Sequence, residues 1–217
     1  MNTSTERQAA IEYFYSVARH TYRAYPLAYH NWGHVLGMLS WLDTLFLDVD
    51  TTEPGWIELT LAILYHDIVY VPGSYAGYNE ETSALMFKRD FNNWIREESI
   101  DIDVDLVCDL IRATSVANHV DPAYVPKSIA EAILLDLDLV SLAAPYTTFL
   151  TNQKAIIAEQ VGRNSFEEQN ARVNSAQFLA KFIAPERKSI YHTTDAQFAF
   201  EEKARRNINQ YLYGEEN

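Results

Sequence analysis

Histidine and aspartate stand beside strongly apolar helical sequence at two places in the chain. His66 and Asp67 directly follow the run LTLAILY, so an imidazole and a carboxylate are expected at or near a buried helix face. Burying an ionised carboxylate without a partner costs several kcal/mol, so Asp67 needs a partner there. His34, four residues after His30, opens a second apolar pattern and is expected near a helix start, close to its buried stripe.

A third polar insertion interrupts the apolar segment AILLDLDLVSLA at Asp136 and Asp138. Residues two apart on a helix point about 200° from each other, so only one of these aspartates can face a given site, and the residue types leave open which. Taken singly, such residues more often form a helix-end polar pair, a hydrogen-bonded core histidine or a surface aspartate.

Together, the two imidazoles and two carboxylates predict one divalent metal ion, which would offset the desolvation of the carboxylates. Mixed nitrogen and oxygen ligands suit Mn, Fe, Co, Ni or Zn, with Mg an alternative when carboxylates, water and substrate phosphate supply most contacts. The ligand types do not choose among these metals.

The composition indicates what must position these groups. The chain has 217 residues, 48% of them apolar, with only 7 Gly and 7 Pro, which excludes disorder, collagen and turn-rich β-barrels. Helical periodicity dominates, and we find neither sustained period-2 alternation nor a Gly-, Ser- or Pro-rich linker. We therefore expect an all-α, single-domain bundle of eight or nine helices.

Residues that favour helix starts stand at the expected N-termini: Ser4 or Thr5, Asn31, Thr52 with Pro54, Asn79, Asp101 or Asp103, Ser165 with Glu168, and Thr194 with Gln197. We expect the first helix to reach about Tyr25, the third to run through Tyr70, the fourth to approach Glu98 and a sixth segment to end before Pro145.

The charge of the chain and the absence of targeting patterns limit which partners and which location are expected. The net charge of −13 opposes binding to long nucleic acid or anionic lipid. No apolar run approaches the roughly 18 residues of a membrane span, and the N-terminus resembles neither a signal nor a transit peptide, so a cytoplasmic protein is expected. Cys108 is the only cysteine, which excludes an internal disulfide and predicts a buried structural thiol.

At this point the chain resembles a known family. His34, the adjacent His66 and Asp67, and a distal aspartate in DLDL match, in order and approximate spacing, the H…HD…D signature of HD-domain metal-dependent phosphohydrolases. The segments YHNWGH, YHDIVY, NEETSA, 114–119, LLDLDLVSLA and IYHTTDAQFAFEEKARRNI further resemble one bacterial subfamily of predicted HD phosphohydrolases, over about residues 10–213.

The resemblance implies a fold and a ligand set. The whole chain, 1–217, would be one HD-type domain, with a core over about 28–145 and C-terminal helices over 146–214 packing on it. His34, His66, Asp67 and one aspartate of DLDL would hold the metal. The second aspartate of such a motif is usually the ligand, so the resemblance favours Asp138 over Asp136.

It also implies roles for residues around the metal. His30 becomes a candidate for phosphate contact or for supporting the ligands, with a structural role as the alternative. Many relatives carry a further acid shortly after the HD pair, whereas Ile68, Val69 and Tyr70 stand there in this chain. Glu80, at the next helix start, is our substitute candidate for proton transfer beside Asp67, although a first-turn glutamate also stabilises the helix dipole.

Further candidates lie near the end of the chain. His119 is assigned to phosphate contact or to loop structure, because a second metal would need more histidines than this chain offers. His192 either begins a helix or closes over the pocket. Arg205 is a candidate for substrate binding, since an anionic substrate approaching an acidic protein needs local positive charge. An apolar helix face could also form a homodimer interface.

The function expected from these residues is hydrolysis of a small phosphate ester, such as a nucleotide, by metal-activated water. The alternative is a non-catalytic HD module that binds metal or nucleotide for regulation, consistent with the missing acid after Asp67. An oxygen-activating di-iron site would need additional histidine or aspartate ligands.

Overall fold

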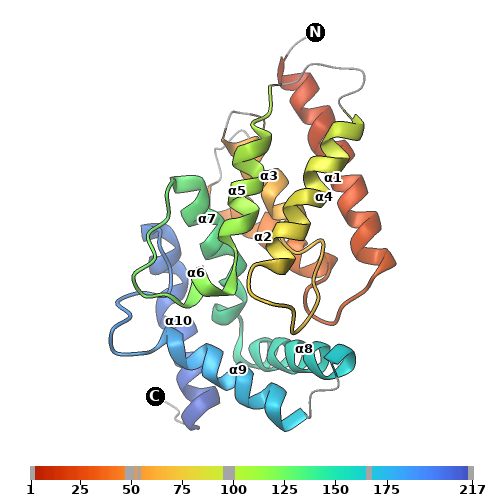
Figure 1. The fold of residues 1–217 in the computed structure, drawn as a ribbon. Helices are drawn as coiled ribbons and strands as arrows, with labels where there is room; N and C mark the ends of the chain where they lie inside the picture. Colours follow the sequence, from red (N-terminus) through yellow and green to blue (C-terminus); the bar gives the residue numbers. More distant parts are fainter. Residues whose placement is uncertain (1–2, 47–51, 53–54, 95–100, 165–167, 215–217) are drawn as a thin grey trace. The chain divides into compact units, whose positions relative to one another are not determined.

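The computed structural model describes residues 3–46, 52, 55–94, 101–164 and 168–214, and these residues form ten α-helices and one short 3₁₀ helix with no strand among them (Figure 1). The all-helical class predicted from the sequence is confirmed. The chain folds into two compact units, one of Met1–Tyr70 with Ser74–Ser115 and one of Val71–Gly73 with Val116–Asn217. The boundary near residue 115 falls inside the segment 28–145 in which the sequence placed the core.

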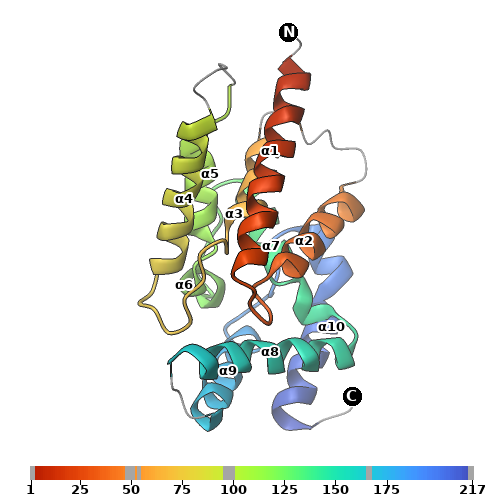
Figure 2. The same cartoon turned by 90° about the vertical axis from the view of Figure 1, so that its right-hand side faces the viewer.

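The first unit consists of α1 (Thr3–Ala24), α2 (Trp32–Leu45), α3 (Trp56–Tyr65), α4 (Tyr78–Trp94) and α5 (Val104–Ala113). Helix α3 packs against each of the other four, and α4 lies beside α5 in both ribbon views (Figures 1 and 2). Every residue of α3 from Ile57 to Tyr65 is buried. An apolar helix buried on all sides is the central element of this unit, and its end carries His66 and Asp67.

Aromatic side chains fill the space between α1, α3 and α4. Phe14 lies with its ring centroid 6.1 Å from Tyr65, 5.5 Å from Phe87 and 6.1 Å from Phe91. The Tyr65 hydroxyl donates to the buried Asp90 at 3.1 Å. Burial raises the pKa of the Tyr65 phenol, and the Asp90 carboxylate raises it further.

At the starts of two helices, the polar side chain predicted from the sequence forms the N-cap. The Asn31 side chain accepts the Gly33 N–H at 2.7 Å at the start of α2, and Asp103 accepts the Leu106 N–H at 2.9 Å at the start of α5. Helix α3 begins differently: Gly55 is the N-cap, and the Glu58 carboxylate accepts the Gly55 N–H at 2.6 Å. Thr52 is therefore not the cap of α3.

The second unit consists of α6 (Val116–Val120), α7 (Ile129–Asp138), the 3₁₀ helix η1 (Val140–Ala143), α8 (Tyr146–Asn164), α9 (Glu168–Phe182) and α10 (Thr194–Tyr213). Helix α10 packs against η1, α8 and α9, and α8 packs along α9. The Asn207 side chain of α10 donates to the carbonyl oxygens of Leu142 and Ala144, both at 2.8 Å. These bonds satisfy carbonyls that the short helix η1 leaves without helical partners.

Several predicted boundaries differ from the structure. Helix α3 ends at Tyr65 rather than Tyr70, because the next backbone groups bond outside the helix, as described below. Helix α10 is capped by Thr193 instead of Thr194, and α4 begins at Tyr78, one residue before the predicted cap Asn79. Helix α6 was not predicted. The predicted features at Pro54, Ser165 and Glu98 lie outside the described residues.

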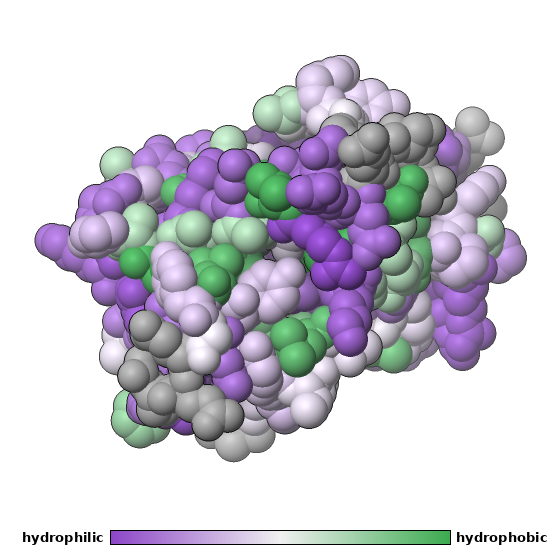
Figure 3. Space-filling model, turned by 90° about the horizontal axis from the view of Figure 1, so that it is seen from below, coloured by the Kyte–Doolittle hydropathy of each residue, from purple (hydrophilic) through white to green (hydrophobic). Residues whose placement is uncertain are grey.

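The surface carries apolar as well as polar side chains. On the face seen from below, several green residues lie next to one another, with white and purple residues around them (Figure 3). The large exposed apolar residues include Phe198, whose exposed fraction is 94%. Among the described residues, every helix is too short or too polar to cross a lipid bilayer.

Candidate metal centre

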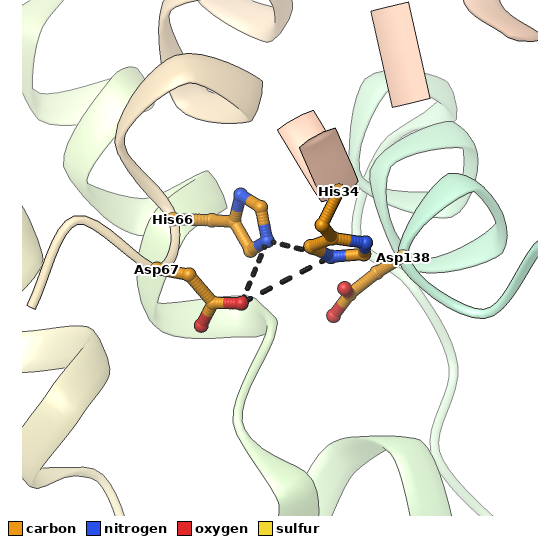
Figure 4. Close-up of side chains that lie close together, drawn as sticks. All are labelled: His34, His66, Asp67 and Asp138. Atoms are coloured by element: carbon orange, nitrogen blue, oxygen red, sulfur yellow. Dashed lines mark hydrogen bonds and ion pairs between the residues drawn. The ribbon is translucent and has the colours of Figure 1, made fainter. Parts of the chain in front are cut away.

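Three predicted ligands lie together in the first unit (Figure 4). Nε2 of His66 lies 3.3 Å from Nε2 of His34 and 3.1 Å from Oδ2 of Asp67, and the His34 and Asp67 atoms are 3.9 Å apart. The His66 side chain is fully buried, and those of His34 and Asp67 are 5% and 15% exposed. We call His34, His66 and Asp67 the metal triad. Asp138, also labelled in Figure 4, belongs to the second unit.

The hydrogen bonding of His66 determines what its other nitrogen offers. Nδ1 lies 2.9 Å from the carbonyl oxygen of Ile63, which can only accept a hydrogen bond, so Nδ1 carries the proton. In the neutral ring Nε2 then presents a lone pair toward His34 and Asp67. Backbone carbonyls orient metal-binding histidines in this way. Two imidazole nitrogens and a carboxylate oxygen fit a divalent transition metal, so the triad could hold one.

The local structure at the end of α3 explains how two neighbouring residues, His66 and Asp67, can both belong to the triad. His66 keeps helical geometry and its N–H donates to Ala62 at 2.8 Å, whereas the Ile68 N–H turns back to Tyr65 at 3.2 Å. The Val69 N–H donates to the Ser83 hydroxyl of α4 at 3.1 Å instead of continuing the helix. Asp67 therefore stands in a turn directly after the helix.

The start of α2 positions His34 in the first helical turn. Besides capping α2, Asn31 donates from Nδ2 to the carbonyl oxygens of Leu27 and Ala28, both at 3.0 Å. A Cβ atom on Gly33 would lie 2.9 Å from the Asn31 Oδ1 atom, so glycine makes room for this cap. The residue immediately before His34 is thus fixed by the cap.

His30 lies beside the triad without being part of it. Its ring stacks on Tyr70 with centroids 3.6 Å apart and planes 16° from parallel. The His30 and His34 centroids are 6.3 Å apart, and Tyr29 packs on His34 at 5.1 Å. Of the roles that the sequence suggested for His30, this stacking favours support of the ligands.

Glu80 occupies the first turn of α4 and is half-buried. It is not one of the residues whose ligand atoms lie within 4.8 Å of one another. Residues three apart share a helix face, so Glu80 lies on the side of α4 where Ser83 contacts Val69. This places it on the face of α4 that meets the segment after Asp67.

The two aspartates of α7 have different partners in the second unit. Asp138 bonds through Oδ2 to His119 Nε2 at 2.9 Å, and His119 is buried. Asp136 accepts the backbone N–H groups of His192 and Thr193, at 2.6 and 2.8 Å, and the Thr193 hydroxyl at 2.7 Å. Burial raises the pKa of Asp136 to about 6, against the lowering effect of these hydrogen bonds. Asp136 therefore holds the start of α10.

His192 lies in the segment that Asp136 holds. Burial lowers the pKa of its imidazole to about 4, and the neighbouring Arg187 and His119 lower it further. Arg187 is buried and donates to the carbonyl oxygens of His119, Ser189 and Ile190. His192 thus takes a place among groups that disfavour its charged form.

Arg205 is bound within its own unit. Its Nε donates to Glu201 at 2.7 Å, and Nη2 donates to the carbonyl oxygens of Arg187 and Lys188. Glu201 also accepts the backbone N–H groups of Ile190 and Tyr191. These contacts give Arg205 a structural role, and its binding of substrate stays a prediction.

Sequence reasoning missed the residues that hold the segment before α10. Arg187 and Glu201 hold this segment through its backbone groups, and the Thr193 hydroxyl bonds to Asp136; no sequence motif indicates these contacts. One signal was available: Glu201 and Arg205 have the i, i+4 spacing of a helical ion pair.

Comparison of the chain with protein-family models, with curated proteins and with solved structures gives no significant match in any of the three.

Proposed function

We propose that this chain is a metal-dependent phosphohydrolase that acts on a small phosphate ester. The observation that supports the proposal most directly is the metal triad, in which His34, His66 and Asp67 direct ligand atoms at one another from the start of α2 and the end of α3. The resemblance of the sequence to HD phosphohydrolases supports the reaction class.

The proposed roles follow from the residues. A divalent ion bound by the triad would polarise a water molecule and neutralise charge on the phosphoryl oxygens. Asp67 is the most exposed side chain of the triad and would also orient the attacking water. Asp138 is the proposed fourth ligand because the motif resemblance selects it and because the carboxylate of Asp136 is filled by three donors.

Glu80 is the proposed proton-transfer residue, since the three residues after Asp67 carry no acid. Glu80→Gln should lower kcat by about 100-fold, the lower range for loss of a general acid or base, and leave metal affinity unchanged. The neighbouring Glu81 provides the control, because it pairs with Arg112 on the surface. Glu81→Gln should keep kcat within about twofold.

The decisive experiment measures phosphate release from nucleotides and phosphomonoesters with Mn²⁺, Co²⁺, Zn²⁺ or Mg²⁺ added in turn. Activity should disappear in His66→Ala and Asp67→Asn. His20→Ala and Asp43→Asn remove the same groups from exposed positions and should retain it. Turnover that survives both triad substitutions unchanged would contradict the proposal.

One observation favours a second candidate, a non-catalytic module that binds metal or nucleotide. The segment after Asp67 offers Ile68, Val69 and Tyr70 where relatives of the resembled family carry an acid. Stoichiometric metal binding with no product from any phosphate ester would support the module over the enzyme.

A further inference from the structure

The segment that follows Asp67 is fixed at two successive residues. Ser83 of α4 accepts the Val69 N–H at 3.1 Å, and its hydroxyl donates to the Val69 carbonyl oxygen at 3.3 Å. Ser83 is completely buried, so this one hydroxyl satisfies both backbone groups of Val69 away from solvent. The next residue, Tyr70, stacks on His30 with ring centroids 3.6 Å apart.

These contacts join the two segments that carry the triad. His30 immediately precedes Asn31, the cap of α2, and His34 stands in the first turn after it. Val69 and Tyr70 stand two and three residues after Asp67. The ring stack therefore connects the start of α2 to the end of the α3 segment, and Ser83 anchors that segment to α4.

We infer that Ser83 and Tyr70 are positioning residues, which hold Asp67 and His66 at ligand distance from His34. The inference rests on the metal-binding part of the proposed function. In this inference the residues after Asp67 act by position and not by proton transfer: the backbone of Val69 and the ring of Tyr70 set the spacing of the ligands. Side chains that orient ligands typically change metal affinity by about 10- to 100-fold.

The test measures the Kd for Co²⁺ and Mn²⁺ by calorimetry, together with the metal-free Tm. Ser83→Ala and Tyr70→Leu should each raise the Kd by about 10-fold or more. Tyr70→Phe keeps the ring and should stay within about twofold of the parent. Ser175→Ala is the matched control, because Ser175 is also buried and donates to Gln153 at 3.0 Å in the second unit.

A merely structural role predicts another pattern. Ser83→Ala and Ser175→Ala would then lower the Tm by similar amounts and both leave the Kd unchanged, which would overturn the inference. If Tyr70→Leu does not fold, the Kd values of Ser83→Ala and Tyr70→Phe still decide between a positioning and a merely structural role. A parent chain that binds metal but hydrolyses nothing defeats the proposed activity and leaves this inference standing. A parent chain that binds none of Co²⁺, Mn²⁺, Zn²⁺ and Mg²⁺ in the same titration defeats both.

Discussion

The metal triad of the first unit and the acid cluster of the second unit, which consists of Asp136 and Glu201, differ in the groups that face their carboxylates. In the second unit, Asp136 and Glu201 accept N–H and O–H donors, several of them from the backbone of residues 190–193. In the triad, the Asp67 oxygen faces the Nε2 atom of His66, whose proton is on the other nitrogen.

The difference shows what separates a structural acid from a ligand. A buried carboxylate surrounded by donors has its desolvation offset by hydrogen bonds. Two imidazole nitrogens and a carboxylate oxygen placed close together are a ligand set that could hold a divalent cation. The backbone donors around Asp136 and Glu201 give these two acids a folding role.

The largest expected effect removes the central ligand of the triad. His66→Ala should weaken Co²⁺ binding by about 10³-fold, or about 4 kcal/mol. This loss exceeds the about 10- to 100-fold that follows removal of a residue that only orients a ligand, because the substitution removes a ligand itself. Calorimetric titration checks this, with His20→Ala as the exposed control. Unchanged binding in His66→Ala would remove the distinction between the two clusters.

The second effect is on stability and concerns the acid cluster. Asp136→Asn should lower the free energy of unfolding by about 2 to 3 kcal/mol, because an amide cannot accept all of the donors from His192 and Thr193. Urea denaturation measures the loss. Metal affinity should remain at the parent value, and a large loss of affinity would mean that Asp136 itself is a ligand.

The third prediction concerns the neighbouring aspartate. If Asp138 completes the ligand set, Asp138→Asn should weaken metal binding by about 10- to 100-fold, or about 1.4 to 2.7 kcal/mol, which is less than His66→Ala because the amide keeps a neutral oxygen ligand. The comparison with Asp136→Asn is direct, since both replace a carboxylate by an amide on the same helix. Equal affinities in parent and Asp138→Asn would restrict the site to the triad.

Local signals predicted the helices and the triad. Asn31 and Asp103 cap their helices as short side chains at such positions should, and the apolar body of α3 announced a buried helix. His34, His66 and Asp67 were found because each interrupts an apolar pattern at its edge. These features depend on neighbours within a few residues, which a single sequence displays.

What could not be predicted depends on distant partners. Helix α3 ends five residues early because Ser83, 14 residues beyond Val69, takes the backbone bonds. Thr193 rather than Thr194 caps α10 where Asp136, 57 residues away, receives its hydroxyl and N–H. Periodicity carries no information about such pairs, so the exact ends of both helices required the structure.

The expected effect that is smallest at neutral pH is a pH dependence in the second unit. Burial lowers the pKa of His192 to about 4, below the ordinary value of about 6.5, and Arg187 and His119 face it as further causes. Between these values the unfolded chain binds a proton at His192 that the folded chain does not, so the contribution of His192 to stability falls as the pH falls from about 6.5 to about 4, by at most about 1.4 kcal/mol per pH unit. The raised pKa of Asp136 acts in the opposite direction in the same range, in parent and variant alike. His192→Asn keeps the backbone N–H that Asp136 accepts and removes this slope. The unfolding free energy of the parent minus that of the variant, measured by urea denaturation across this range, should decrease as the pH falls. A difference that stays constant would mean that His192 is protonated as readily in the folded as in the unfolded chain.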